Sequence, residues 1–478
     1  MKTKDNKNSF VKAFAIFLLM FAVVFASALI KYWAYGSFEG EVPQDFYIAV
    51  ATCAIAVLLI IVAQFTYFIY SRHRLFENIK RLAVICTAIA ITTVACIALS
   101  AVNLFYMPMS LTAFILVPLI DRRDAFLANI TTTLIVSTVL ILEAIIGSKV
   151  ETLAVVVMLV IGVFVGSVAS YTMHEVSRRT AFVVKGMGLG VISMALSFLA
   201  SYIVNSVDFV NGLLYITGIA FGQPIFSIVL QPIFESVFNL TTNTKLTELT
   251  DHSAPLIKRL IDEAPGTFNH SLSVAGFAEI CALQIGENPY LAKACAYYHD
   301  VGKLKNPKFF SENQSGFNPH DELLPEVSAS ILRSHTAYGE ELCTEHRIPY
   351  EISHVVSQHH GTLPMAVFYN KAKNLTDGEV DIAEYSYDGI TPRSKIAAII
   401  MICDASEAAL RAKGKPTRDE AEQIVLGIIN DRIARRQFDR CPVTMADLNT
   451  IRNTIIEQYS GVFHDRVKYP DGKAVYRD

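Results

Sequence analysis

The chain has 478 residues, of which 52% are hydrophobic and 18% are charged, and its formal net charge is −3. This length accommodates two or three domains, and the slightly acidic balance argues against a nucleic-acid-binding surface. The eight cysteines include no CxxC pair, so we interpret them as reduced and structural, as expected for a cytoplasmic domain.

Residues 1–239 consist of long apolar runs separated by short polar loops. An apolar stretch of about 20 residues is long enough to span a bilayer. Seven stretches qualify, at about 13–30, 46–70, 82–104, 125–147, 152–173, 186–204 and 212–234. An eighth stretch, from Leu111 to Ile120, is shorter. We therefore predict a transmembrane region of about eight helices over residues 1–239.

The charges of the loops predict the orientation of this region, because lysine and arginine concentrate on the cytoplasmic side. Basic residues mark the N-terminus and the loops that hold Arg72, Arg122-Arg123 and Arg178-Arg179. The loops between these are acidic or uncharged. This alternation requires the short stretch that begins at Leu111 to cross as well. With eight crossings, both ends of the chain lie in the cytoplasm.

Two features of the apolar half have alternative interpretations. The lysines before the first run, together with Ala26-Ser27-Ala28, are also typical of a cleaved secretory signal, although the run is long for one. Gln223-Pro224 and Gln231-Pro232 interrupt the last stretch. They predict either a flexible joint that transmits a signal or kinks between packed helices. Few charged residues lie within the spans, which argues against a transporter.

Residues 253–478 have the pattern of an all-α domain, preceded by a polar connector at 240–252. Apolar residues recur at helical spacing over about 267–285, 289–300, 327–342, 351–360, 394–410, 417–433 and 444–459. No alternation typical of a strand is evident. The predicted fold is therefore a polytopic α-helical membrane bundle followed by an all-α domain.

Candidate metal ligands are distributed over these predicted helices. The pair His299-Asp300 offers a neutral imidazole nitrogen and a carboxylate able to bridge two ions. The other candidates lie on four further helices: His270, His335, His359, His360 and Asp404. A single helical histidine is usually structural, and a His-His pair beside a glycine also fits a solvated helix end. Asp404, however, ends an apolar run, where an unpaired carboxylate is costly.

These seven ligands suit two first-row divalent ions, which can activate water and hold phosphoryl oxygens. Their order, H…HD…H…HH…D, resembles the HD-domain metal-dependent phosphohydrolases in the variant with extra histidines for a second metal. The surrounding sequence is similar to that of the seven-transmembrane-HD family of bacterial membrane proteins, over nearly all of residues 240–470 and more loosely over the membrane half. The resemblance rests on EAPGTFNHS at 263–271, YHDVGK at 298–303, ENQ at 312–314, NPHD at 318–321, QHHGT at 358–362 and INDR at 429–432.

The resemblance implies that a cytoplasmic HD domain hydrolyses cyclic di-AMP to the linear dinucleotide pApA at a di-iron or di-manganese centre. It implies one metal on His270, His299, Asp300 and Asp404. The second metal is then held by His335, His359 and His360, with Asp300 bridging. Asp300 and Lys303 are the catalytic candidates. Lys303 and, as the weaker candidate, Arg393 would neutralise a substrate phosphate, although a solvated lysine after a helix would look the same.

One departure from the family concerns the loop from Gly36 to Asp45. Family members usually carry a large extracellular domain there, and this loop is too short to fold alone. We therefore expect regulation through the membrane helices, their lipids or a partner.

The ligand set leaves the substrate open. Cyclic di-GMP, pApA and a guanosine alarmone are alternative substrates, and a non-catalytic nucleotide-binding membrane receptor is an alternative of another class. The expected partners are a cyclic dinucleotide and the lipid bilayer, with no nucleic acid polymer. A homodimer is compatible with the sequence.

Overall fold

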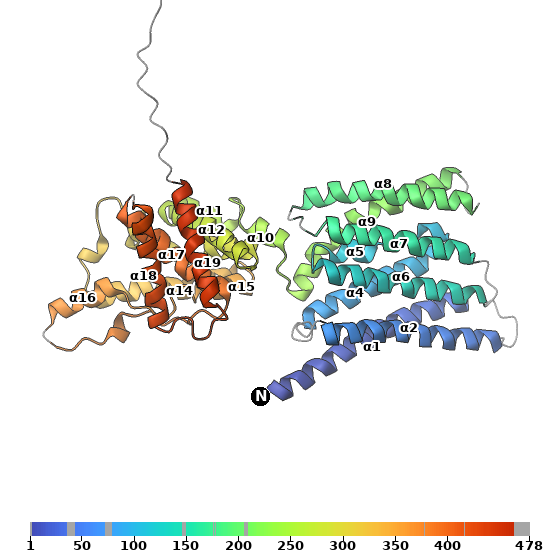
Figure 1. Ribbon diagram of the computed structural model, residues 1–478, viewed down its shortest axis with the longest axis horizontal. Helices are drawn as coiled ribbons and strands as arrows, with labels where there is room; N and C mark the ends of the chain where they lie inside the picture. The colour runs from blue at the N-terminus through green and yellow to red at the C-terminus, as the bar shows by residue number, and fades with distance from the viewer. Residues whose placement is uncertain are drawn as a thin grey trace, which may run out of the picture. The chain divides into compact units, whose positions relative to one another are not determined.

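The computed structural model describes residues 2–35, 44–71, 79–145, 150–174, 176, 178–204, 209–376, 378–414 and 416–462. The chain divides into two compact units, Met1–Thr244 and Lys245–Asp478. The described residues form helices and an isolated β-bridge between Pro364 and Ser386, but no strand (Figure 1). The predicted fold class, a membrane helix bundle followed by an all-α domain, is confirmed.

Within the described part of the first unit, seven helices are long and apolar enough to cross a membrane. They are α1 (Lys2–Tyr35), α2 (Gln44–Ser71), α4 (Ile79–Ser100), α6 (Arg122–Ile145), α7 (Thr152–Thr172), α8 (Arg179–Ile203) and α9 (Phe209–Phe238). Consecutive helices of the series α6, α7, α8 and α9 pack against one another, and in Figure 1 α8 lies at the edge of the bundle. Helix α9 continues through Pro224 and Pro232, so both prolines lie inside one helix, and whether they act as a joint or as kinks stays a prediction. The loops at 36–43, 72–78, 146–149 and 205–208, which carry much of the charge argument, lie outside the described residues.

The short apolar stretch between α4 and α6 forms the 3-10 helix η1 (Leu104–Tyr106) and helix α5 (Leu111–Leu116). Six helical residues rise only about 9 Å, less than the bilayer core of about 30 Å. Two ion pairs show how this stretch runs. Where the two helices begin, Arg81 of α4 lies 2.7 Å from Asp121, which directly precedes α6. Where they end, Lys31 contacts both Ser100, the last residue of α4, and Glu143 near the end of α6.

Helices α4 and α6 are therefore parallel, and residues 101–121 return from one end of the bundle to the other. Most of this returning segment is buried, as Phe105 and Phe114 illustrate. Non-helical backbone is tolerated at membrane depth only where protein surrounds it. The geometry supports an eighth crossing, which stays a prediction because its orientation rests on loops outside the described residues.

The second unit begins within α10 (Asn243–Leu249), which occupies much of the predicted connector. Its remaining α-helices are α11 (Pro255–Glu263), α12 (Pro265–Gln284), α13 (Pro289–Tyr298), α14 (Pro325–Glu345), α15 (Tyr350–Val356), α16 (Ala366–Leu375), α17 (Lys395–Lys413), α18 (Arg418–Ala434) and α19 (Met445–Val462). Between α13 and α14 the chain forms four short 3-10 helices: η2 (Val301–Lys305), η3 (Pro307–Phe309), η4 (Ser311–Asn313) and η5 (Pro319–Asp321). A further one, η6 (Ile382–Tyr385), follows α16.

Helices α12 and α17 form the centre of this unit. Helix α17 is buried almost continuously from Ile396 to Cys403, because α12, α13, α15, α18 and α19 surround it. An all-round apolar helix is stable only when it is covered in this way. Helix α13 starts where the Asn288 side chain accepts hydrogen bonds from two backbone amides and Pro289 occupies the first turn. This cap fixes where α13 begins; the helix ends at Tyr298, and His299-Asp300 follows directly.

Candidate metal centre

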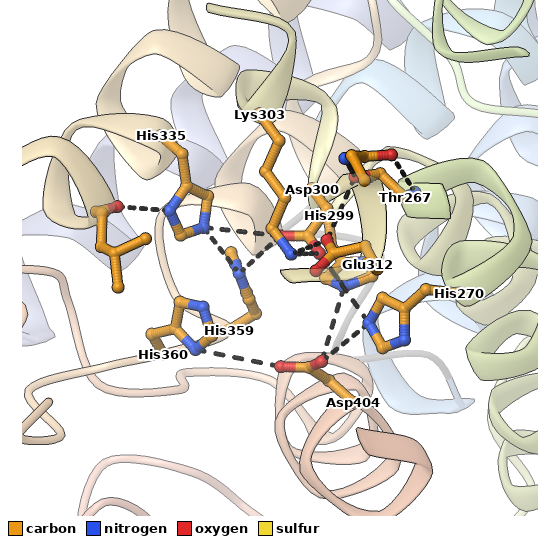
Figure 2. A network of polar contacts seen from close by, with 12 residues as sticks. Thr267, His270, His299, Asp300, Lys303, Glu312, His335, His359, His360 and Asp404 are labelled. Carbon is orange, nitrogen blue, oxygen red and sulfur yellow. Dashed lines mark hydrogen bonds and ion pairs between the residues drawn. The ribbon is translucent and has the colours of Figure 1, made fainter. Parts of the chain in front are cut away.

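All seven predicted ligands converge on one buried centre (Figure 2). His270 lies on α12, His299 caps the end of α13, and Asp300 follows it. His335 lies in the middle of α14 and Asp404 lies on α17. The prediction that a helix ends in His359-His360 is wrong: α15 ends at Val356, and the pair lies in the following turn. In that turn Gly361 has a φ of 54°, which favours glycine.

The ligands form two groups. We call His270, His299 and Asp404 the Asp404 group, and Asp300, His335, His359 and His360 the His335 group. In each group the nitrogen and oxygen atoms lie within 4.8 Å of one another. This spacing suits one ion per group, because ligands about 2 Å from a common ion lie roughly 3–4 Å apart.

Asp300 connects the two groups through its two oxygens. Oδ2 lies 3.2 Å from His299 Nε2 and 3.8 Å from His270 Nε2. Oδ1 lies 3.4 Å from His335 Nε2 and 3.6 Å from His359 Nε2. Each oxygen thus faces one group, which is the arrangement that a bridging carboxylate requires.

Hydrogen bonds fix the tautomers of three histidines. Each Nδ1 donates to the carbonyl oxygen three residues earlier: His299 to Ala296 at 2.7 Å, His335 to Leu332 at 2.5 Å and His359 to Val356 at 2.7 Å. When such a ring is neutral, its Nε2 atom carries a lone pair that points into the centre.

The residues fit divalent cations on grounds of their own geometry. His299 Nε2 and Asp300 Oδ1 are buried and have no hydrogen-bond partner among the described residues, which is costly unless something else satisfies them. His335 Nε2 and His359 Nε2 lie 3.3 Å apart, and two lone pairs at this distance repel unless they share a proton or a cation. The donor set of imidazoles and carboxylates is typical of first-row divalent ions.

The charges of the two groups differ. Burial lowers the pKa of His335 to about 3, so this ring stays neutral. Burial acts in the same direction on His299, but the carboxylates of Asp300 and Asp404 outweigh it and raise the pKa of that ring to about 10. The Asp404 group therefore attracts positive charge strongly, and a cation would compete there with a proton.

Lys303 and Arg393, the other predicted site residues, have different positions. Lys303 Nζ lies 2.7 Å from Asp300 Oδ2 and 2.7 Å from Glu312 Oε1. Burial opposes its charge, yet these two carboxylates raise the pKa of Lys303. The side chain of Arg393 is exposed and forms no hydrogen bond or ion pair with the described residues, while its backbone amide donates to Gln358 Oε1 at 2.8 Å.

Three further residues of the centre were missed from the sequence. Glu407 Oε2 accepts from His270 Nδ1 at 2.5 Å, and its place one turn after Asp404 on α17 could have identified it. Glu312 fixes Lys303 and also accepts from Thr267 Oγ1 at 3.1 Å. Tyr387 stacks on His360 with ring centroids 4.2 Å apart. Glu312 lies in η4 within the ENQ motif at 312–314, which could have identified it, whereas no local pattern marks Tyr387, which lies outside the helices.

Comparison with known proteins agrees with this organisation. A profile of the HD domain matches residues 267–409, which include all seven ligands. A profile described as "7TM receptor with intracellular HD hydrolase" matches residues 46–242. The chain thus matches both parts of a 7TM-HD protein, the membrane region and the HD domain. It is accordingly a multi-pass membrane protein whose second unit contains an HD domain with a cluster suited to divalent metal.

Two curated relatives of this chain are named cyclic-di-AMP phosphodiesterase PgpH. The protein from Listeria monocytogenes is 40% identical over 313 residues, which are 64% of this chain and 44% of the relative. The protein from Bacillus subtilis is 39% identical over 263 residues, which are 54% of this chain and 37% of the relative. The chain thus spans less than half the length of either relative. The solved HD domain of L. monocytogenes PgpH in complex with cyclic-di-AMP is 43% identical and covers 45% of this chain and 100% of its own, with a TM-score of 0.43.

Proposed function

We propose that this chain is a membrane-anchored phosphodiesterase that hydrolyses cyclic di-AMP to pApA and so lowers the concentration of the second messenger. The observation that carries the proposal is Asp300, whose two oxygens face two separate groups of metal ligands. A pair of ions bridged in this way is suited to in-line displacement at phosphorus. The names of the two PgpH relatives supply the nucleotide.

The proposed cofactors are two divalent transition metals. The imidazole-rich donor set favours such ions over magnesium, and the family resemblance favours iron or manganese among them. The Asp404 group and Asp300 Oδ2 would hold one ion, and the His335 group, with Asp300 Oδ1, would hold the other. When bound, such ions lower the pKa of water and hold phosphoryl oxygens.

Lys303 provides positive charge beside the reacting phosphate. Its ammonium is buried between Asp300 and Glu312, and the raised pKa keeps it protonated. It therefore acts electrostatically rather than as a base. If Asp300 Oδ2 were to bind a metal ion, Glu312 would still hold the Lys303 ammonium in place. Arg393 is left as a peripheral candidate for the same task, since its exposed side chain is free to move toward an anion.

An open cleft of about 410 Å³ gives a dinucleotide space beside the centre. It is lined by Gly266, Asn269, Ser311, Glu312 and Arg411. Asn269 precedes the ligand His270, and Glu312 contacts Lys303, so the cleft adjoins the Asp404 group. A phosphodiester on the metal pair would leave the rest of a cyclic dinucleotide to extend toward this cleft.

We place the HD domain in the cytoplasm. The alternation of basic and non-basic loops supports this side, as does the intracellular hydrolase of the family description. Homodimerisation stays a prediction from the sequence.

The test uses the full-length chain in detergent micelles, stripped of metal and reloaded with Mn²⁺ or Fe²⁺. Cyclic di-AMP, cyclic di-GMP, pApA and a guanosine alarmone are supplied in parallel, and the products are separated by chromatography. We expect pApA from cyclic di-AMP, and no turnover by Asp300→Ala, because this change removes the bridging carboxylate.

Glu345→Ala is the matched control, because Glu345 is an exposed acid at the end of α14. Normal turnover by Asp300→Ala would refute the assigned site. Tight binding of cyclic di-AMP without product under either metal would instead indicate a receptor. Faster turnover of another nucleotide would identify that nucleotide as the substrate in place of cyclic di-AMP.

A further inference from the structure

His360 differs from the other histidines of the centre in how its ring is held. His299, His335 and His359 are fixed by carbonyl oxygens, and His270 by Glu407. The His360 ring forms no hydrogen bond with the described residues. Its nearest charged atom is Asp404 Oδ2, 3.9 Å from Nδ1, and 24% of the side chain is exposed. Without another contact, this ring would rotate freely.

Aromatic contacts hold the His360 ring in its orientation. The Tyr387 ring stacks on His360 with centroids 4.2 Å apart and an interplanar angle of 23°. The same tyrosine meets the edge of His335, with centroids 6.0 Å apart and an angle of 88°. On the other side His360 packs against His359 at 4.0 Å. Stacked and edge-to-face pairs at these distances are attractive and orient both rings.

The backbone around Tyr387 is tied to the turn that carries His360. The Tyr387 amide donates to Leu363 O at 3.0 Å, and the Met365 amide donates to Tyr385 O at 2.7 Å. Two residues after Tyr387, a Cβ on Gly389 would lie 2.7 Å from Ser357 O and 2.9 Å from Gly361 O. Only glycine permits this close approach, so the returning segment is held directly against the His359-His360 turn.

We propose that Tyr387 is a positioning residue of the His335 group. Its ring holds the His360 imidazole in the orientation in which this histidine binds metal, in place of the hydrogen bond that fixes each of the other rings. The inference rests on the metal centre of the proposed function, but not on the identity of the nucleotide. It predicts that the aromatic face matters and that the hydroxyl does not.

The experiment measures metal affinity directly, on the full-length chain in detergent micelles. Metal-free protein is titrated with Mn²⁺, and free Mn²⁺ is followed by electron paramagnetic resonance. The wild type should bind two ions per chain. For Tyr387→Leu we expect one ion to bind about tenfold more weakly, the usual effect of removing a residue that orients a ligand. Tyr387→Phe keeps the ring and should bind both ions like the wild type.

Tyr369→Leu is the matched control, because Tyr369 lies on α16 and packs near Tyr385 rather than on a ligand. It should bind both ions normally. The proposal is overturned if Tyr387→Leu binds both ions with wild-type affinity, if Tyr387→Phe loses as much affinity as Tyr387→Leu, or if Tyr369→Leu loses as much.

Circular dichroism establishes that each variant is folded. If Tyr387→Leu does not fold, Tyr387→Met fills the volume without a ring and carries the same expectation. Because metal binding is the readout, a wild type that binds two ions but leaves cyclic di-AMP intact would refute the proposed function and leave this inference standing.

Discussion

Glu407 offers a test of how the Asp404 group is built. Its Oε2 atom accepts from His270 Nδ1 at 2.5 Å, and His270 Nε2 lies 3.0 Å from Asp404 Oδ1. The carboxylate therefore fixes the ring and increases the basicity of the nitrogen that faces the metal. In Glu407→Ala the Nδ1–H group stays buried without an acceptor.

Loss of such a partner reduces metal affinity by about 10- to 100-fold, or about 1.4–2.8 kcal/mol at 1.4 kcal/mol for each factor of ten. Glu407→Gln keeps an acceptor at the same place but loses the charge, so its loss should be smaller. Only one of the two ions should be affected, because Glu407 touches no residue of the His335 group among the contacts described.

The assay is the same Mn²⁺ titration of the full-length chain, with Glu345→Ala as the control. Glu407→Ala should bind one ion normally and the other more weakly, and Glu407→Gln should fall between it and the wild type. The reasoning is refuted if Glu407→Ala binds both ions with wild-type affinity, or if both ions weaken equally.

Three further predictions follow from contacts of the second unit. A Cβ on Gly302 would lie 1.8 Å from His335 O and 2.6 Å from Gly339 N. Gly302→Ala should therefore separate η2 from α14 and destabilise the second unit by about 1–3 kcal/mol or more. A melting temperature equal to that of the wild type would contradict this prediction. Removing metal with a chelator should lower the melting temperature of the second unit, because the buried ligands repel one another without a cation. Adding Mn²⁺ should restore the melting temperature. An unchanged melting curve would exclude bound metal. Burial alone would raise the pKa of Asp431, but Arg435 and Arg432 lower it below its usual 3.8. The stability from these ion pairs is thus present above about pH 4 and is lost as the pH falls through the lowered pKa of Asp431. The wild type should therefore have a slightly larger free energy of unfolding than Asp431→Asn at neutral pH, and this difference should vanish at low pH. A difference that persists at low pH would contradict the ion-pair origin.

The sequence by itself determined the elements and the ligand types of this protein. Apolar runs of membrane-spanning length identify seven helices, because the bilayer sets their length. Helical spacing located α12, α14 and α17, because a buried face imposes a period of 3.6 residues. Asp404 stood out because an aspartate in an apolar run requires a partner.

Only the tertiary structure decided how these parts meet. Spacing along the chain carries no distance between helices, so it could not show that each oxygen of Asp300 faces its own group of ligands. It also could not place Lys303 on Asp300 and Glu312. Tyr387 reaches the centre from a segment outside the helices and Glu312 from the short 3-10 helix η4, and in neither does a period mark a buried face. The path of residues 101–121 through the bundle likewise depends on contacts between distant helices, such as Arg81 with Asp121 and Lys31 with Glu143.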